Sequence, residues 1–363
     1  MPIYMDRHDV SKEVTAESVA RLHQEDLKIQ HKYNCRGLTY WFDDKRKTAF
    51  CLVEAPNAES VNKMHKHAHG ELSHSIIEVD ASLIESFLGR MQDPDVKPGA
   101  ELNIIDEPAF RFLLSVRIQI GQLNNKQDKG LASTIRDYMH KVIEVVNDKQ
   151  GTLVRKGSRN LLASLTTAQH AVHCGLVLHE TFGNVYPHLS LSIGLDAGLP
   201  VESNKSIFEE TIQTSRRLCE MERGFSVSPV VLKLYQDEQS DTDLNSMEFT
   251  KISVVEMIFF NKLFDFLEAN FSHAKLRIDA FASSLGYSRS QAYRNSVGLL
   301  GFSPNVYFNK YRLEKSLDKL DSGMNTVSET AFLCGFSSSS YYSKCFRSMY
   351  GISPKDYMTA IHS

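Results

Sequence analysis

The feature that most constrains the fold of this chain is a repeat near its C-terminus. Gly286-Tyr287-Ser288 recurs 49 residues later as Gly335-Phe336-Ser337, and Gly301-Phe302-Ser303-Pro304 recurs 50 residues later as Gly351-Ile352-Ser353-Pro354. Each copy predicts a helix, a glycine turn, a serine cap and a second helix, because glycine commonly ends helices and serine commonly begins them. The Ser-Pro pair then starts the next helix. The sequence therefore predicts two helix-turn-helix units in tandem.

The second helix of each unit is predicted to have one buried and one exposed face. In the later copy the residues spaced to face the core are Tyr342, Phe346 and Met349. The outer face and N-terminal end of these two helices carry hydroxyls and cations: Arg289, Ser290 and Arg294 in the first copy, and Ser338, Ser339, Ser340, Lys344 and Arg347 in the second. Such side chains suit a helix that enters the major groove of double-stranded DNA. An ordinary solvated helix would carry the same residues, and it is the duplication that favours DNA.

A long helix over residues 305–320 is predicted between the two units, with Val306, Leu313, Leu317 and Leu320 on a core face. A rigid connector of this kind could hold two recognition helices about one DNA turn (~34 Å) apart. From Lys251 onward the chain holds 13 Lys and Arg against 9 Asp and Glu, whereas the whole chain has a net charge of -3. The basic tail on an acidic body points to an anionic partner.

The run VSETAFLCGFSSSSYYSKCFRSMYGISPKDY, residues 327–357, resembles the second helix-turn-helix of AraC/XylS-type transcription regulators. The resemblance extends over residues 255–361. It implies base or backbone contacts from Ser290 and Arg294 in the first copy and from Ser339, Ser340 and Lys344 in the second. The first copy departs from the family pattern at Ala292, where a larger aliphatic residue is usual, and at residues 295–298, which replace a basic, Phe-containing run.

Two polar, helix-breaking stretches, residues 89–108 and 236–250, divide the 363-residue chain into segments 1–88, 109–235 and 251–363. The first segment predicts strand, helix, strand, strand, helix, strand, at residues 3–9, 15–32, 38–42, 48–54, 57–69 and 75–79, an order that fits a ferredoxin-like α+β sandwich. The second predicts an α/β domain with strands at residues 112–120, 152–155, 160–164, 189–196 and 225–227. The third is predicted to be entirely helical. We therefore expect a multidomain protein.

Histidines are concentrated in the first segment, where a metal site is one interpretation. His65 and His69 are four residues apart on a predicted helix and share a face, as His23 and Asp26 do on another. His8 ends the first strand. Imidazoles four residues apart can hold nickel, zinc or copper, although exposed polar residues on amphipathic helices would give the same pattern.

The stretches MPIYMDRHDV, LHQEDL and FCLVEAPNAESVNKMHKHAHG, within residues 1–80, resemble a family of small ferredoxin-like nickel-binding proteins. This resemblance implies a bound transition metal such as nickel, with His8, His23, His65 and His69 as candidate ligands.

The middle segment is similar to a class III nucleotide cyclase domain in LSIGLDAGLPVES (residues 191–203), TIQTSRRLC and FSVS (residues 225–228). Such enzymes need two aspartates to hold metal ions. Ser115 and Gly157-Ser158 occupy the expected positions, and Gln213 replaces an asparagine, although Arg217 remains. We therefore expect a degenerate domain without cyclase activity, which dimerises or binds a ligand.

Together these patterns predict a cytoplasmic transcription regulator that binds double-stranded DNA and is not an enzyme. Its N-terminal domains would sense a metal or another effector, form a homodimer, or do both. The alternative is a nickel-binding protein with a DNA-tethering tail. No apolar run approaches the ~20 residues of a membrane span, the N-terminus lacks a secretory signal pattern, and six cysteines without a CxxC motif suggest reduced thiols.

Overall fold

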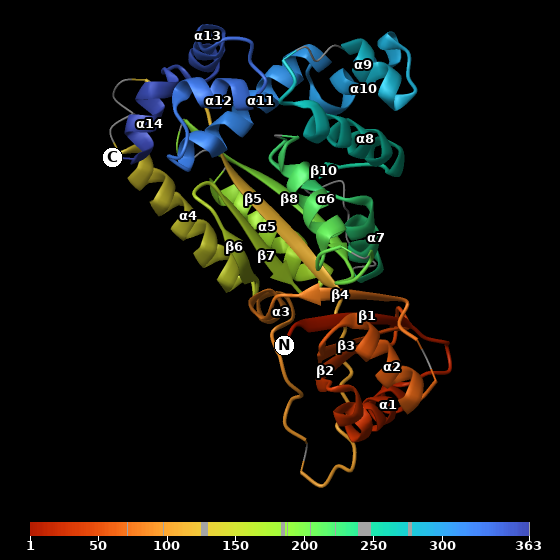
Figure 1. Cartoon of the computed structure of the whole chain (residues 1–363). Coiled ribbons are helices and arrows are strands. Elements are labelled where there is room, and N and C mark those ends of the chain that lie inside the picture. Colours follow the sequence, from red (N-terminus) through yellow and green to blue (C-terminus); the bar gives the residue numbers. More distant parts are fainter. Residues whose placement is uncertain are drawn as a thin grey trace.

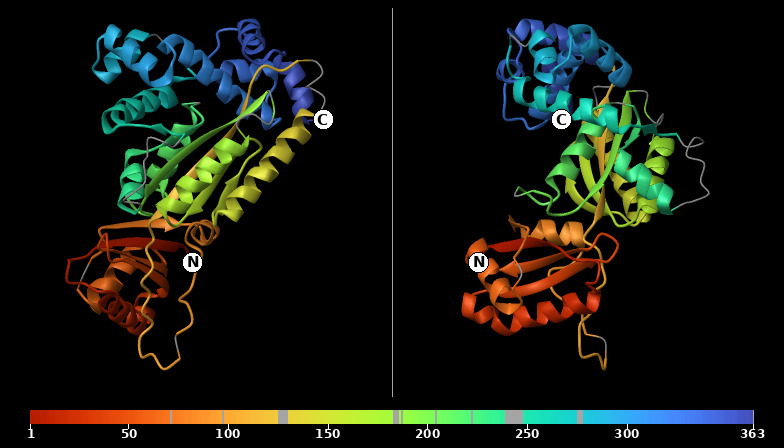
Figure 2. Two further views of the ribbon diagram at one scale, coloured as in Figure 1. Left: turned by 180° about the vertical axis from the view of Figure 1, so that it is seen from behind. Right: turned by 90° about the vertical axis from the view of Figure 1, so that its right-hand side faces the viewer.

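The computed structural model describes residues 1–70, 72–96, 98–124, 130–182, 186, 188–203, 205–221, 223–238, 248–274 and 278–362. It consists of a four-stranded sheet, a six-stranded sheet and a helical C-terminal part (Figure 1). The four-stranded sheet and the C-terminal helices lie at opposite ends of the six-stranded sheet in all three views (Figure 2). None of the helices in the described part of the chain combines the length and hydropathy needed to cross a bilayer.

The N-terminal sheet is antiparallel with the strand order β2-β3-β1-β4, and its connectivity is the one predicted. Thr15 and Asn57 cap its two long helices by accepting hydrogen bonds from the third backbone N–H of each helix. Apolar side chains of these helices pack on one face of the sheet. The elements are β1 (Ile3–Asp9), α1 (Ala16–Ile29), the 3-10 turn η1 (Gln30–Tyr33), β2 (Arg36–Asp43), β3 (Thr48–Glu54), α2 (Ala58–Ala68), β4 (Ser75–Val79) and α3 (Ala81–Leu88).

The six-stranded sheet has the order β10-β9-β8-β5-β7-β6, with β5 at its centre. β5 runs antiparallel to β7 and β8, whereas β9 runs parallel to β8. One face of this sheet shares a core with α4, α5 and α7, and α6 packs on the other face. The elements are β5 (Arg111–Ile120), α4 (Leu131–Asp148), β6 (Thr152–Lys156), β7 (Asn160–Leu165), α5 (Ala168–Phe182), β8 (Leu189–Gly198), α6 (Glu209–Cys219), β9 (Phe225–Val227), α7 (Pro229–Glu238) and β10 (Thr250–Lys251).

The C-terminal part contains two helix pairs joined by α11, as the repeat predicts. The first pair packs with α8 around a core that includes Phe260, Phe264 and Phe281. The second pair shares the larger core of the six-stranded sheet, and α14 contacts α4. The helices are α8 (Val254–Asn270), α9 (Ile278–Leu285), α10 (Arg289–Leu300), α11 (Pro304–Asp321), α12 (Val327–Leu333), α13 (Ser339–Tyr350) and α14 (Pro354–His362).

The three parts are joined by buried contacts as well as by the chain. The second face of the N-terminal sheet is covered by α3 and by side chains of the six-stranded sheet and α6, among them Leu113, Leu162 and Ile212. Between the six-stranded sheet and α11 the contact is ionic. Arg117 and Arg159 pair there with Asp318, at 2.8 and 2.9 Å between nitrogen and oxygen. The C-terminal helices are therefore fixed on the six-stranded sheet.

The structure corrects three details of the sequence interpretation. Val306 is 52% exposed, and the core face of α11 begins instead with Tyr307 and Phe308. Part of the stretch 89–108 packs on the N-terminal sheet, because Ile105 is buried there and the Phe42 amide donates to the Glu107 carbonyl, whereas residues 94–96 and 98–101 are exposed. The stretch 236–250 gives its first residues to α7 and its last to β10, and residues 239–247 lie outside the described residues.

Candidate DNA-binding face and metal centre

Each helix-turn-helix unit is built from the same local contacts. Gly286 and Gly335 end the first helices with φ of 70° and 77°, a left-handed conformation that glycine adopts without strain. Ser288 and Ser338 then cap α10 and α13, where their side chains accept from the amides of Gln291 and Tyr341 at 3.2 Å. The first cap is the predicted Ser288, whereas the cap of the second copy is Ser338, one residue after Ser337 of the repeated motif.

Gly335 also permits a close contact between helices. A Cβ atom at this position would clash with the carbonyl oxygen of Phe271, the residue that follows α8. Arg312 of α11 donates to the same oxygen at 2.8 Å. The second unit is thus held against both α8 and the connecting helix α11.

The inner faces of α10 and α13 are buried, and their outer faces are exposed. Tyr342, Phe346 and Tyr350 are fully buried on α13. The predicted contact residues lie on the opposite side. Of these, Ser338 and Ser339 are half-buried, whereas the remaining six are exposed: Arg289, Ser290, Arg294, Ser340, Lys344 and Arg347.

One exposed aromatic residue on each recognition helix was not predicted as a contact. Tyr293 is 50% exposed and lines a surface groove with Arg289, Ser290 and Arg294. Tyr341 is 48% exposed on α13. A large aromatic side chain that falls outside the core spacing of its helix is the sequence signal that could have identified both. Figure 1 shows α10 and α13 on either side of α11, at the end of the molecule farthest from the N-terminal sheet.

The histidines of the N-terminal part converge on two buried carboxylates between the sheet and its helices. Asp6 and His8 come from β1, and their side chains lie on one face because they are two residues apart on a strand. Ligand atoms of Asp6, His8, Cys51 and His65 all lie within 4.8 Å of one another, and so do those of Asp26, His65 and His69. His65 joins the two groups: its Nε2 lies 2.7 Å from Asp6 Oδ2 and its Nδ1 lies 3.0 Å from Asp26 Oδ2.

The members of this cluster hold charges on one another although they are buried. Burial disfavours a charged imidazole at His65, yet the carboxylates of Asp6 and Asp26 raise its pKa to about 10. Burial opposes ionisation of Asp6 as well, but the neighbouring His8 and His65 hold its pKa well below the ordinary value. Burial raises the pKa of the Cys51 thiol.

The donor set fits a transition metal ion. Asp26 Oδ1 and His69 Nδ1 are buried without a hydrogen-bond partner among the described atoms. Imidazole, carboxylate and thiol donors together suit nickel or zinc rather than magnesium or calcium. These residues could therefore hold such an ion.

Three of the four predicted histidine ligands, His8, His65 and His69, are brought together, and His23 is not part of either group. Its Nε2 instead lies 3.2 Å from Asp93 Oδ2. Asp6 and Cys51 were missed as candidate donors. The spacing Asp-x-His on a strand could have identified Asp6, whereas Cys51 meets the cluster only through strand pairing, since its amide donates to Asp6 Oδ1 at 3.0 Å.

Two middle-segment residues that were compared with a nucleotide cyclase, Ser115 and Arg217, are paired with other residues of this chain. Ser115 lies in β5 and exchanges a 2.9 Å hydrogen bond with Ser215 of α6. Arg217 is paired with Asp265 and Glu268 of α8, both at 2.6 Å. The relation to nucleotide cyclases stays a prediction.

Comparison with known proteins gives two separate family matches. A family model described as nickel responsive protein SCO4226-like matches residues 4–79. A model of a helix-turn-helix domain matches residues 281–360. The C-terminal part is therefore a helix-turn-helix domain. More particularly, it is an AraC-type domain, and this chain joins it to an SCO4226-like domain at the N-terminus.

Individual relatives cover only parts of this chain. The HTH-type transcriptional regulator GbdR from Pseudomonas aeruginosa is 34% identical over 90 residues, which are 25% of this chain and 24% of GbdR. The solved SCO4226 of Streptomyces coelicolor is 32% identical with a TM-score of 0.20, covering 21% of this chain and 94% of that one. An AraC-type regulator structure from Chromobacterium violaceum is 25% identical with a TM-score of 0.28, covering 30% and 95%.

Proposed function

We propose that this protein is a cytoplasmic transcription regulator that binds specific sites in double-stranded DNA through α10 and α13. The observation that carries the proposal is the duplication itself. Two capped helices, each with a buried aromatic or aliphatic face, present hydroxyls and cations to solvent on the opposite face. Arg294 and Lys344 are the exposed cations at corresponding depth in the two copies, and Ser290 and Ser340 lie near the N-terminal ends.

The test begins with selection of bound duplexes from a random pool, because the operator is not known. Fluorescence anisotropy with a selected duplex and with a shuffled duplex should then give a preference for the selected one. Binding should weaken as salt rises, because phosphate contacts release counterions. Equal affinity for both duplexes with no salt dependence would contradict the proposal.

Single substitutions distinguish contacts with DNA phosphates from contacts with DNA bases. Lys344→Ala should weaken binding and, if the ammonium contacts a phosphate, reduce the salt slope by about 1. Arg294→Ala should cost about 1–3 kcal/mol if the guanidinium reads a base. Lys141→Ala is the matched control, because Lys141 is an exposed cation on α4, outside both recognition helices. An equal loss in Lys141→Ala would assign the effect to net charge.

We propose as a second function that the N-terminal domain binds a divalent transition metal such as Ni²⁺ and serves as a sensor. His65, Asp26 and His69 would hold the ion, with Asp6 at the other ring nitrogen of His65 and with His8 and Cys51 beside Asp6. Support comes from the convergence of these donors and from the match to a nickel-responsive family. The alternative, a metal-handling protein whose tail only tethers it to DNA, makes the same prediction for metal but none for regulation.

Equilibrium dialysis against Ni²⁺ followed by metal analysis tests this second function. The parent chain should retain metal stoichiometrically, and His65→Ala and His69→Ala should lose it. His140→Ala is the control, because the His140 side chain is 74% exposed on α4. Retention of metal by His65→Ala, or no retention by the parent, would contradict the assignment.

We further propose that the middle domain contributes to a homodimer and has no cyclase activity. Sedimentation equilibrium should then give twice the mass of the chain. Incubation with ATP or GTP and Mn²⁺ should give no cyclic nucleotide above background, and accumulation of one would overturn the second part of this proposal.

A further inference from the structure

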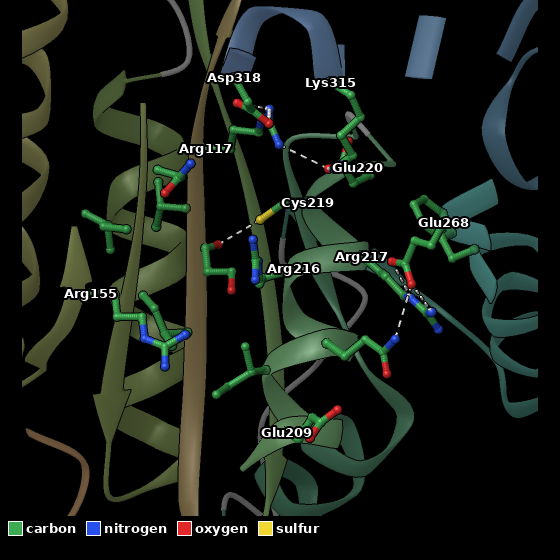
Figure 3. Close-up of a pocket in the computed structure, with 18 of the residues that line it drawn as sticks. Arg117, Arg155, Glu209, Arg216, Arg217, Cys219, Glu220, Glu268, Lys315 and Asp318 are labelled. Atoms are coloured by element: carbon green, nitrogen blue, oxygen red, sulfur yellow. Dashed lines mark hydrogen bonds and ion pairs between the residues drawn. The ribbon is translucent and has the colours of Figure 1, made fainter. Parts of the chain in front are cut away.

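A cavity of about 700 Å³ lies between the six-stranded sheet and the C-terminal helices. Its floor is formed by β5, β6 and β7, one wall by α6, and the opposite end by α8 and α11 (Figure 3). This volume is within the range of cavities that hold small organic ligands. The cavity is separate from both the recognition helices and the histidine cluster.

Most charged side chains that line the cavity neutralise one another. Arg117 pairs with Glu220 at 3.1 Å and with Asp318 at 2.8 Å. Lys315 pairs with the same Glu220 at 2.9 Å, and the pairs of Arg217 with α8 are described above. Glu209 pairs with Lys205 at 3.9 Å and also accepts from the amide and the hydroxyl of Ser206, both at 3.0 Å.

Two lining cations are different. Arg155 of β6 and Arg216 of α6 are exposed, and neither guanidinium makes a hydrogen bond or ion pair with the part of the chain that the structure describes. Figure 3 shows Arg155 and Arg216 on opposite sides of the β5 ribbon. A guanidinium presents parallel N–H donors that match a carboxylate or phosphate. Two unneutralised guanidinium groups that share a cavity therefore favour a ligand with two negative charges.

The end of the cavity between α8 and α11 carries three aromatic side chains beside the paired Glu268 and Lys315. Phe264 and Phe271 reach it from α8 and its C-terminal end, and Tyr311 reaches it from α11. Phe264 and Tyr311 are already packed in the core of the first helix-turn-helix unit. A ligand that satisfies both ends would carry its charge on an aromatic or apolar body.

We propose that this cavity binds a small organic dianion, in which a phosphate monoester or a pair of carboxylates is attached to an aromatic or apolar group. Arg155 and Arg216 bind the charged end, and Phe271, which is half-buried beside the buried Phe264 and Tyr311, contacts the body. The bound molecule therefore touches the sheet and the C-terminal end of α8 at once. An effect on DNA affinity rests on the proposed regulator function, whereas the binding itself does not.

Isothermal titration calorimetry of the full chain with phenyl phosphate, phthalate and benzyl alcohol tests the site. Saturable binding of phenyl phosphate or phthalate, but not of benzyl alcohol, is expected, and the better of the two identifies the charged group. Inorganic phosphate should bind more weakly than phenyl phosphate, because it lacks the apolar body. Absence of binding by both organic dianions at millimolar concentration would overturn the proposal.

Arg155→Gln and Arg216→Gln should each weaken the better dianion by about tenfold, since each removes one charge-assisted contact. Arg136→Gln is the matched control, because Arg136 is exposed on α4 and does not line the cavity. Unchanged thermal unfolding of the variants will show that they fold. Unchanged affinity in the Arg155→Gln/Arg216→Gln double variant would overturn the assignment of these residues.

The two proposals fail separately. DNA affinity measured without any dianion tests the regulator, and dianion binding measured without DNA tests the cavity. If both hold, saturating dianion should change the DNA affinity of the parent and leave that of the double variant unchanged.

Discussion

Replacing Arg159 by methionine tests the ionic contact that fixes the C-terminal helices on the six-stranded sheet. The Arg159 side chain is fully buried, with its Nη2 2.9 Å from Asp318 Oδ1 and its Nε 2.7 Å from Asp321 Oδ2. Burial opposes its charge, but Tyr357, Asp321 and Asp318 hold the pKa of the guanidinium well above its ordinary value. Methionine fills much of the same volume, so the variant loses the charge with little loss of packing.

The loss of stability in this variant comes from the carboxylates of Asp318 and Asp321, which lose a positively charged partner. Removing one partner of a buried ion pair typically costs about 3–5 kcal/mol, because the other charge stays buried without compensation. Asp321 keeps a 2.6 Å hydrogen bond from the Tyr357 hydroxyl, and Asp318 keeps Arg117. We therefore expect the low end of the range, a decrease of about 3 kcal/mol in the free energy of unfolding.

Urea unfolding followed by circular dichroism measures this decrease. Arg155→Met, in β6, is the control and should change the free energy of unfolding by less than about 0.5 kcal/mol, because Arg155 is exposed. The double variant Arg159→Met/Asp321→Asn should lose less free energy of unfolding than the two single variants lose together. The difference should be about 1 kcal/mol or more. Additive costs, or a loss below about 1 kcal/mol for Arg159→Met, would refute the reasoning.

Three further substitutions test the local physics of the fold. Burial raises the pKa of Asp196 from 3.8 to about 6, so stability from its protonated form is complete below about pH 4 and is lost as the pH rises through 6. In urea unfolding, the free energy of unfolding of Asp196→Asn should therefore exceed that of the parent by up to about 3 kcal/mol at pH 7.5 and equal it at pH 4. A difference between the two proteins that does not vary with pH would contradict this. Gly194→Ala should destabilise by about 1–3 kcal/mol, since its Cβ would clash with the Ser215 carbonyl oxygen of α6, and an unchanged urea midpoint would be unexpected. Thr326→Ala should lower the thermal midpoint by removing about 1 kcal/mol of the free energy of unfolding, because Thr326 and Glu329 form a capping box at α12. Ser328→Ala, at an exposed site in the same turn, is the control and should leave the midpoint unchanged.

Local contacts explain which elements could be predicted from the sequence. The caps of α1, α2, α10 and α13 depend on residues three apart, and the strands depend on alternation, so both are encoded within short windows. α7 was missed because its start at Pro229 follows a short strand and its end runs into an acidic stretch. β10 was missed because two residues carry no periodicity, and its pairing with β9 depends on a neighbour far along the chain.

The candidate sites divide in the same way. The exposed faces of α10 and α13 follow from helical periodicity, because the residues that pack inward leave the others outside. The metal cluster could be predicted only in part: His65 and His69 share a helix, but Asp6, Asp26 and Cys51 meet them through the packing of α1, β1 and β3. The cavity with Arg155 and Arg216 could not be predicted, since its walls come from residues 115–318.

The sequence by itself therefore determined the tandem helix-turn-helix units, the strand and helix order of the N-terminal sheet and the family resemblances at both ends. Each of these depends on the spacing of residues that are close together in the chain. Only the tertiary structure decided that α11 is an ionic bridge as well as a connector, that His23 pairs with Asp93, and that two arginines from different elements share one cavity. These features depend on which buried charges find partners across the fold, and no local pattern specifies that choice.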